Sequence, residues 1–143
     1  MEKGKLVELI TIPKIIDDCL LFFAQHGNHI PFHIRRVYYI LNASIGFSRG
    51  SHAHFKTKQA LFCLSGSIRI VLSDGRRKKT IILDSPDTGI FLDQMIWHEM
   101  HDFKKNTIIL VLASRKFNEK DYIRDYKKFK EIVNNEKSIN QVK

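Results

Sequence analysis

Cysteine is scarce in this sequence, and the two that occur, Cys19 and Cys63, lie far apart. No CxxC or similar spacing is present, so neither a zinc knuckle nor a redox pair is predicted. Cys63 lies in the apolar run 60–64, which indicates a buried free thiol. The chain is therefore expected to fold without covalent cross-links in a reducing compartment.

Long apolar runs are also missing. No stretch of about 18 apolar residues occurs, which excludes a transmembrane helix, and the segment that begins at Met1 turns polar too soon for a secretory signal. We therefore expect a cytoplasmic protein that does not bind membranes. Repeats, linkers and breaks in composition are absent as well. We expect a single domain over residues 1–136 and a disordered tail over 137–143.

Acidic residues are few compared with basic ones. The chain has 24 lysines and arginines and 15 acidic residues, which gives a net charge of +9. A basic chain favours anionic partners such as nucleotides or nucleic acids. The basic residues are scattered in short groups, without a stripe that alternates with aromatic residues. Nucleic-acid binding is therefore not expected, and most of these residues are expected on a solvated surface.

Short runs of β-forming residues, separated by turn residues, occupy most of the chain. Such spacing favours an all-β sandwich or barrel. The dipeptide Ser65-Gly66 predicts that the runs 60–64 and 68–72 form a hairpin, and Ser73-Asp74-Gly75 predicts a second turn. The runs are 37–41, 60–64, 68–72, 80–83, 89–92 and 107–113.

The C-terminal part differs from this pattern. Asn118 is a suitable N-cap, and Asp121 follows at a position where an acid favours a helix start. Apolar residues then recur at helical spacing up to Val133. We predict an amphipathic helix over residues 118–134 that packs on the β body or on a partner subunit.

One segment carries a pattern with chemical meaning. It reads Gly46-x5-His52-x-His54-x4-Gln59-x6-Gly66 and resembles the first sequence motif of the cupins. Alternate residues of a strand face the same side, so His52 and His54 are expected to project together. Histidine titrates near neutral pH, and a pair of imidazoles can therefore both remove and return a proton.

A metal site is the main alternative for these histidines. Metal-binding cupins have a carboxylate where this chain has Gln59, and a neutral amide is a weaker ligand for a hard divalent ion. Their second motif supplies a histidine after a Pro-x-Gly turn, and this turn is missing before His98. We expect neither a metal nor another cofactor. A site of three histidines that includes His98 stays open, as does a cupin that binds a nucleotide sugar without catalysis.

The chain is similar to the sugar-nucleotide 3,4-ketoisomerases of the WxcM-like cupin family. The segments that carry this resemblance are 30–40, 49–54, Gln59, 64–66, 83–86, 97–103, 111–114 and 121–126. The resemblance implies an RmlC-like jelly-roll barrel with a C-terminal helix, and a homodimer. It also implies an isomerase that converts dTDP-4-keto-6-deoxy-D-glucose to its 3-keto isomer without a cofactor. The product would serve the synthesis of an amino sugar for a surface glycan.

The resemblance assigns roles to individual residues. His52 and His54 match the catalytic histidines, and Tyr39 matches an active-site tyrosine. Tyr38 and Tyr39 alternate on one strand, so one of them is expected in the core, and the sequence does not say which.

Four further residues are expected to contact the substrate. Arg36 and Arg49 match arginines that bind the diphosphate, and Gln59 and His98 would line the cavity. The segment 17–25 lacks an Arg-Gly pair that is common in the family, which leaves the configuration of the product at C4 open.

Overall fold

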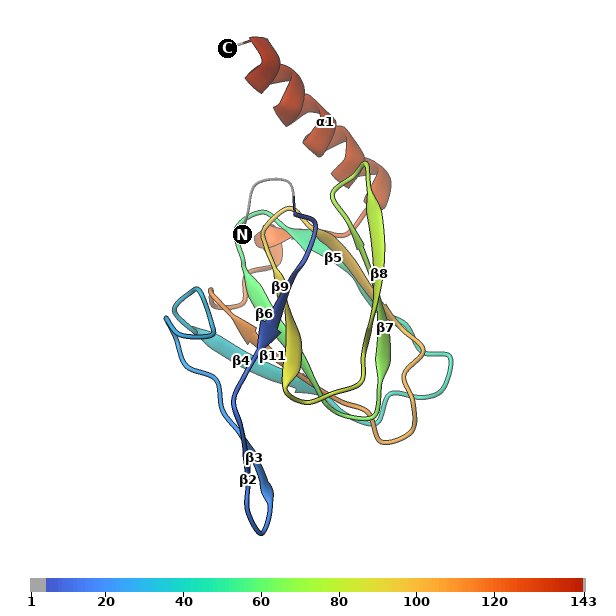
Figure 1. The fold of residues 1–143 in the computed structure, drawn as a ribbon. Helices are drawn as coiled ribbons and strands as arrows, with labels where there is room; N and C mark the ends of the chain where they lie inside the picture. The colour runs from blue at the N-terminus through green and yellow to red at the C-terminus, as the bar shows by residue number, and fades with distance from the viewer. Residues whose placement is uncertain (1–4, 143) are drawn as a thin grey trace.

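The computed structural model describes residues 5–142 and consists of short strands with one long helix at the C-terminal end (Figure 1). The elements are β1 (Glu8–Thr11), β2 (Lys14–Ile16), β3 (Leu20–Phe22), β4 (Arg36–Ile40), β5 (Arg49–His54), β6 (Gln59–Ser65), β7 (Ile68–Ser73), β8 (Lys78–Leu83), β9 (Thr88–Leu92), β10 (Trp97–His101), β11 (Ile108–Ala113), the 3₁₀ turn η1 (Glu119–Asp121), β12 (Tyr122–Ile123) and α1 (Tyr126–Val142). The predicted all-β body with a C-terminal helix is confirmed.

Two antiparallel sheets form the barrel. One has the strand order β1-β9-β6-β11-β4, and the other has the order β12-β5-β10-β7-β8. Figure 1 shows them facing each other across the interior, while the β2–β3 hairpin projects away from the barrel. Strands that are distant in sequence therefore lie side by side, as β5 does with β10 and with β12.

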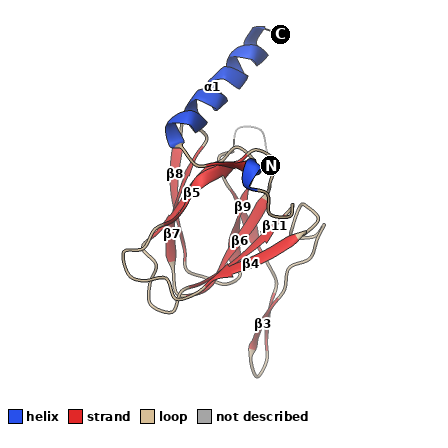
Figure 2. Cartoon of the chain, turned by 180° about the vertical axis from the view of Figure 1, so that it is seen from behind, coloured by secondary structure: helices blue, strands red, loops and turns tan. Residues whose placement is uncertain are grey.

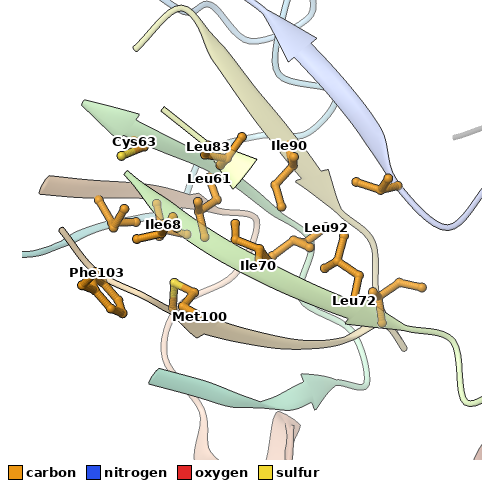
Figure 3. Close-up of a cluster of buried hydrophobic side chains, with 14 of the residues drawn as sticks. Leu61, Cys63, Ile68, Ile70, Leu72, Leu83, Ile90, Leu92, Met100 and Phe103 are labelled. Carbon is orange, nitrogen blue, oxygen red and sulfur yellow. The ribbon is translucent and has the colours of Figure 1, made fainter. Parts of the chain in front are cut away.

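The core fills the space between the sheets (Figure 3). In β7, the alternate residues Ile68, Ile70 and Leu72 are buried, as expected for a strand with one face toward a core. Leu61 and Ile90 come from the opposite sheet and belong to the same cluster. This core fixes the two walls between which a pocket can form.

The turn between β6 and β7 depends on a glycine. Gly66 has φ +74°, and a Cβ atom there would lie 2.3 Å from the Thr107 hydroxyl oxygen. Only glycine adopts this conformation at so close an approach without strain. The chain does turn at Ser65-Gly66, but the predicted hairpin of runs 60–64 and 68–72 is wrong, because β6 and β7 belong to different sheets. The prediction for Cys63, a buried free thiol, is confirmed.

The C-terminal segment departs from the predicted helix of residues 118–134. Asn118 does act as a cap, since its side chain accepts a hydrogen bond from the Lys120 amide, but it caps only the 3₁₀ turn η1. Tyr122 and Ile123 then pair with β5 as strand β12. The cap signal is local and cannot reveal this long-range pairing, which delays the helix to Tyr126.

Helix α1 also ends later than predicted. It continues to Val142, so residues 137–142 are helical where a disordered tail was expected, and Lys143 lies outside the described residues. Phe129 and Val133 are buried in a small cluster against the barrel. Figure 2 shows the rest of α1 extending away from one end of the barrel. Within residues 5–142, no helix has both the length and the apolar character required to cross a bilayer.

Candidate active site

A pocket of about 520 Å³ opens into the barrel interior and is lined mainly by side chains of β4, β5 and β10. Four residues that the sequence analysis placed near the substrate line this pocket, namely Arg36, Arg49, His52 and His98. Tyr38, the neighbour of the predicted Tyr39, lines it as well.

His52 occupies a half-buried position in the pocket wall. Its Nδ1 lies 3.0 Å from the Gly50 carbonyl oxygen, so Nδ1–H donates to this oxygen and Nε2 keeps a free lone pair. Burial, together with the neighbouring His54, lowers the pKa of His52 to about 4. His52 is therefore a neutral base at neutral pH.

Gly50 allows β5 to approach β10 closely at this point. Its φ is +84°, and an added Cβ would lie 2.9 Å from the carbonyl oxygen of His98. A larger residue would push the two strands apart. This glycine therefore holds His52 close to His98, its partner in the strand register.

His54 lies on the same side of β5, with its ring centroid 5.0 Å from that of His52. The ring is buried more deeply than His52 and lies behind the pocket wall. Its Nδ1 is 3.3 Å from a carboxylate oxygen of Asp121, and its Nε2 is buried without a hydrogen-bond partner. Burial lowers the pKa of His54, whereas the Asp121 carboxylate acts in the opposite direction.

Asp121 contacts His54, although the sequence analysis treated it as an acid at a helix start. Its carboxylate accepts hydrogen bonds from the Lys56 amide at 2.8 Å and from both the amide and the hydroxyl of Thr57. Burial alone would raise its pKa, but these bonds and His54 hold the pKa below the usual value. The ionised carboxylate can therefore orient His54 and balance its charge when the ring takes a proton. The segment 121–126, part of the family resemblance, was the available signal.

His98 completes a cluster of three imidazoles. It is buried, and its ring centroid lies 4.5 Å from that of His52. Burial, with His52 and His54 nearby, keeps the pKa of His98 well below its usual value. The potential ligand atoms of the three rings lie within 4.8 Å of one another. Neutral imidazoles suit zinc, copper, iron or nickel, so these residues could hold such an ion, although the cluster contains no carboxylate.

The structure corrects the assignment of the active-site tyrosine. Tyr39 is 66% exposed and is not among the residues that line the pocket. Tyr38 lines the pocket, because successive residues of β4 face opposite sides of the sheet. Burial raises the pKa of Tyr38 to about 12, so its phenol stays protonated and can donate a hydrogen bond.

Gln59 positions this tyrosine. Gln59 is fully buried, and its Nε2 donates to the Tyr38 hydroxyl oxygen at 2.8 Å. The phenolic hydrogen is therefore free to point toward a bound substrate. Gln59 itself lies behind Tyr38 and is not among the pocket-lining residues, where the sequence analysis had placed it.

The predicted arginines Arg36 and Arg49 both line the pocket, and a third, Arg124, joins them. The Arg36 guanidinium lies over the rings of Tyr38 and Phe117, and its buried Nε has no hydrogen-bond partner. Arg124 lies 4.3 Å over the ring of Tyr122 and is ion-paired with Glu119. Three cations around one pocket favour an anionic ligand.

A family model described as "FdtA: WxcM-like, C-terminal" matches residues 5–134. The chain belongs to the WxcM-like family. This WxcM-like chain is 44% identical over 127 residues to TDP-4-oxo-6-deoxy-alpha-D-glucose-3,4-oxoisomerase of Aneurinibacillus thermoaerophilus, covering 88% of the chain and 91% of that relative.

Solved structures of the family agree with this membership. A 3,4-ketoisomerase from Helicobacter canadensis is 40% identical, with a TM-score of 0.87 and coverage of 90% of this chain and 97% of the other. A mutant of the 3,4-ketoisomerase QdtA from Thermoanaerobacterium thermosaccharolyticum, solved with TDP-4-keto-6-deoxyglucose, is 37% identical. Its TM-score is 0.87, and the match covers 90% of this chain and 94% of the other.

The likeness of the fold extends beyond the family. The RmlC epimerase of Mycobacterium tuberculosis superposes with a TM-score of 0.71 at 21% identity, over 85% of this chain and 70% of the other. The RmlC-like cupin barrel expected for this WxcM-like chain is confirmed.

Proposed function

We propose that this WxcM-like chain is an isomerase that converts dTDP-4-keto-6-deoxy-D-glucose to the corresponding 3-keto sugar. The observation that carries the proposal is the pair His52 and His54, one imidazole in the pocket wall and one behind it, whose Nδ1 atoms are each held by an acceptor. Relatives with the same fold are named for this reaction, and one was solved with this substrate.

The reaction requires one proton to leave C3 and one to arrive at C4. His52 faces the pocket directly, so its Nε2 removes the hydrogen from C3. The electrons of that bond form the C3–C4 double bond of an enediolate, and the oxygen on C4 becomes negative. A proton then adds to C4, the C3 hydroxyl passes its proton to the oxygen on C4, and the ketone remains at C3. The reaction needs no oxidant or reductant.

Other residues stabilise the enediolate, transfer protons or bind the substrate. The protonated Tyr38 donates a hydrogen bond to the enediolate oxygen, and Gln59 holds the phenol in place. His54, with its charge balanced by Asp121, is the second proton-transfer group. Arg36 and Arg49 bind the diphosphate, since guanidinium groups donate paired hydrogen bonds to phosphate oxygens.

Product analysis tests the proposal. The purified chain is incubated with dTDP-4-keto-6-deoxyglucose, and ¹³C NMR locates the carbonyl carbon. We expect the carbonyl to move from C4 to C3, and we expect the same rate after dialysis against a chelator. A ketone that stays at C4 while C3 or C5 inverts would indicate an epimerase and contradict the proposal.

The same experiment addresses the metal alternative, which the cluster of His52, His54 and His98 favours. A metal-dependent cupin would lose turnover with the chelator and regain it with a transition-metal ion. Binding of the sugar without any movement of the carbonyl would indicate a non-catalytic nucleotide-sugar-binding protein.

We also propose that the chain works as a homodimer in the cytoplasm, where it contributes to amino-sugar and surface-glycan synthesis. The projecting β2–β3 hairpin exposes Ile15, Ile16, Leu20 and Leu21. A second copy of the chain is the occupant we propose for this apolar arm, because so many exposed apolar side chains are unusual on a monomer.

The mass in solution tests the dimer. Light scattering at micromolar concentration is expected to give twice the 16.7 kDa mass of the chain. Ile16→Asp is expected to shift the mass toward the monomer, since Ile16 is 70% exposed and lies outside the barrel core. A wild-type mass of 16.7 kDa would contradict the proposal.

A further inference from the structure

A chain of hydrogen bonds that the proposed mechanism does not use ends in the pocket wall at Ser48. The Ser48 hydroxyl oxygen lies 3.0 Å from Nδ1 of His101, although 53 positions separate the two residues in the sequence. Nε2 of His101 lies 2.9 Å from a carboxylate oxygen of Glu99. The other oxygen of Glu99 accepts a hydrogen bond from the Trp97 indole at 2.9 Å.

The acceptors in this chain determine where its hydrogens lie. Burial alone would raise the pKa of Glu99, but the bonds from Trp97 and His101 hold it below the usual value, so Glu99 is an ionised acceptor. Nε2 of His101 therefore carries a hydrogen. The neighbouring acid Asp102 has its own partner, since its carboxylate oxygen lies 2.6 Å from Nε of Arg69.

Ser48 consequently presents lone pairs to the pocket. In the neutral ring, Nδ1 of His101 has a lone pair and accepts the hydrogen of the Ser48 hydroxyl. The Ser48 oxygen then accepts, and does not donate, toward a ligand. An ionised phosphate has no hydrogen to offer, so the matching ligand group is a hydroxyl or an N–H.

The position of Ser48 along the pocket also limits which part of a bound nucleotide sugar can reach it. His101 lies three residues beyond His98 on β10, which corresponds to about 10 Å along a strand. Because His52 is the partner of His98, Ser48 lies well beyond a hexose ring held at His52. Phe47, next to Ser48, also lines the pocket and provides an aromatic surface there.

We propose that Ser48 accepts a hydrogen bond from the nucleoside part of the bound nucleotide sugar, through a ribose hydroxyl or the imide N–H of a thymine-like base. His101 and Glu99 are positioning residues that keep the Ser48 hydroxyl in its accepting orientation. The inference rests on the proposed function, because it assumes a nucleotide sugar in this pocket.

Calorimetric binding of dTDP tests the inference. Ser48→Ala is expected to weaken dTDP binding about 3- to 10-fold, the effect of losing one neutral hydrogen bond. Ser44→Ala, in the same loop but outside the pocket wall, is the matched control. Glu99→Gln is expected to weaken binding when Ser48 is present and to have no further effect in the Ser48→Ala background. A merely structural effect of Glu99 would persist in that background.

Two analogues identify the donor. N3-methyl-dTDP lacks the imide hydrogen, and 3′-deoxy-dTDP lacks the 3′-hydroxyl of the deoxyribose. The analogue without the relevant donor should bind more weakly to the wild type and show no additional loss with Ser48→Ala. Equal losses in both proteins for both analogues, or a Ser48→Ala affinity within about twofold of wild type, would overturn the inference. Turnover of the keto sugar by the wild type is measured in parallel, so failure of the proposed function is recognised separately.

Discussion

Replacing His52 by asparagine is expected to lower kcat for the keto sugar by about 10²–10⁴-fold, the usual contribution of a general base. Asparagine can still donate a hydrogen bond to the Gly50 carbonyl, which His52 contacts at 3.0 Å, so the local backbone should persist. It cannot accept the proton from C3. Turnover is followed by NMR at saturating substrate, and His26→Asn, at an exposed histidine outside the pocket wall, serves as the control.

The pH dependence gives a second measure of the same residue. Because the pKa of His52 is lowered to about 4, the ring stays unprotonated and competent as the pH falls below neutrality. We expect kcat/KM to stay level between about pH 8 and pH 5 and to fall only below that range. Turnover by His52→Asn close to that of the wild type would remove the residue from the mechanism.

His54 and Asp121 should behave as one unit in the same assay. His54→Asn is expected to reduce kcat strongly, and Asp121→Asn less so, because the imidazole remains but loses its carboxylate partner. The double variant should be no slower than His54→Asn alone. Since Asp121 also accepts bonds from Lys56 and Thr57, thermal unfolding is recorded for each variant.

Tyr38→Phe is the substitution with the second-largest expected effect, a loss of about 10²–10³-fold in kcat, as found when a donor to a developing oxyanion is removed. The variant keeps the aromatic ring in the pocket wall and removes only the hydroxyl that Gln59 orients. The phenol, with its pKa raised to about 12, is protonated throughout the assay range.

The adjacent tyrosine provides the matched control. Tyr39→Phe removes a hydroxyl from the exposed outer face of the same strand and should leave kcat near the wild-type value. If Tyr39→Phe reduced kcat while Tyr38→Phe did not, the placement of the enediolate beside Tyr38 would be wrong.

The parts of the site that follow from local spacing could be predicted from the sequence. Two residues apart on a strand, His52 and His54 had to project to one side of β5. The choice between Tyr38 and Tyr39 could not be made in this way, since a shift of one residue exchanges the two faces of a strand. Only the pairing of β4 with β11 decides it.

Contacts between distant segments lay beyond the sequence. Asp121 is 67 positions from His54, and the pairing of β12 with β5 brings them together. That pairing also explains the late start of α1, because the Asn118 cap signal describes only its own turn. The hydrogen bond between Ser48 and His101 likewise depends on how β5 and β10 align.

The central claim is that imidazoles at this pocket remove the proton from C3 and that C4 of the resulting enediolate takes a proton that has exchanged with solvent. Turnover in D₂O tests it most directly, with NMR of the product after brief incubation. We expect deuterium at C4 of the 3-keto product, and we expect almost no labelled product with His52→Asn. Complete transfer of the C3 hydrogen to C4 under every condition, or labelling that survives in His52→Asn at the wild-type rate, would contradict the account.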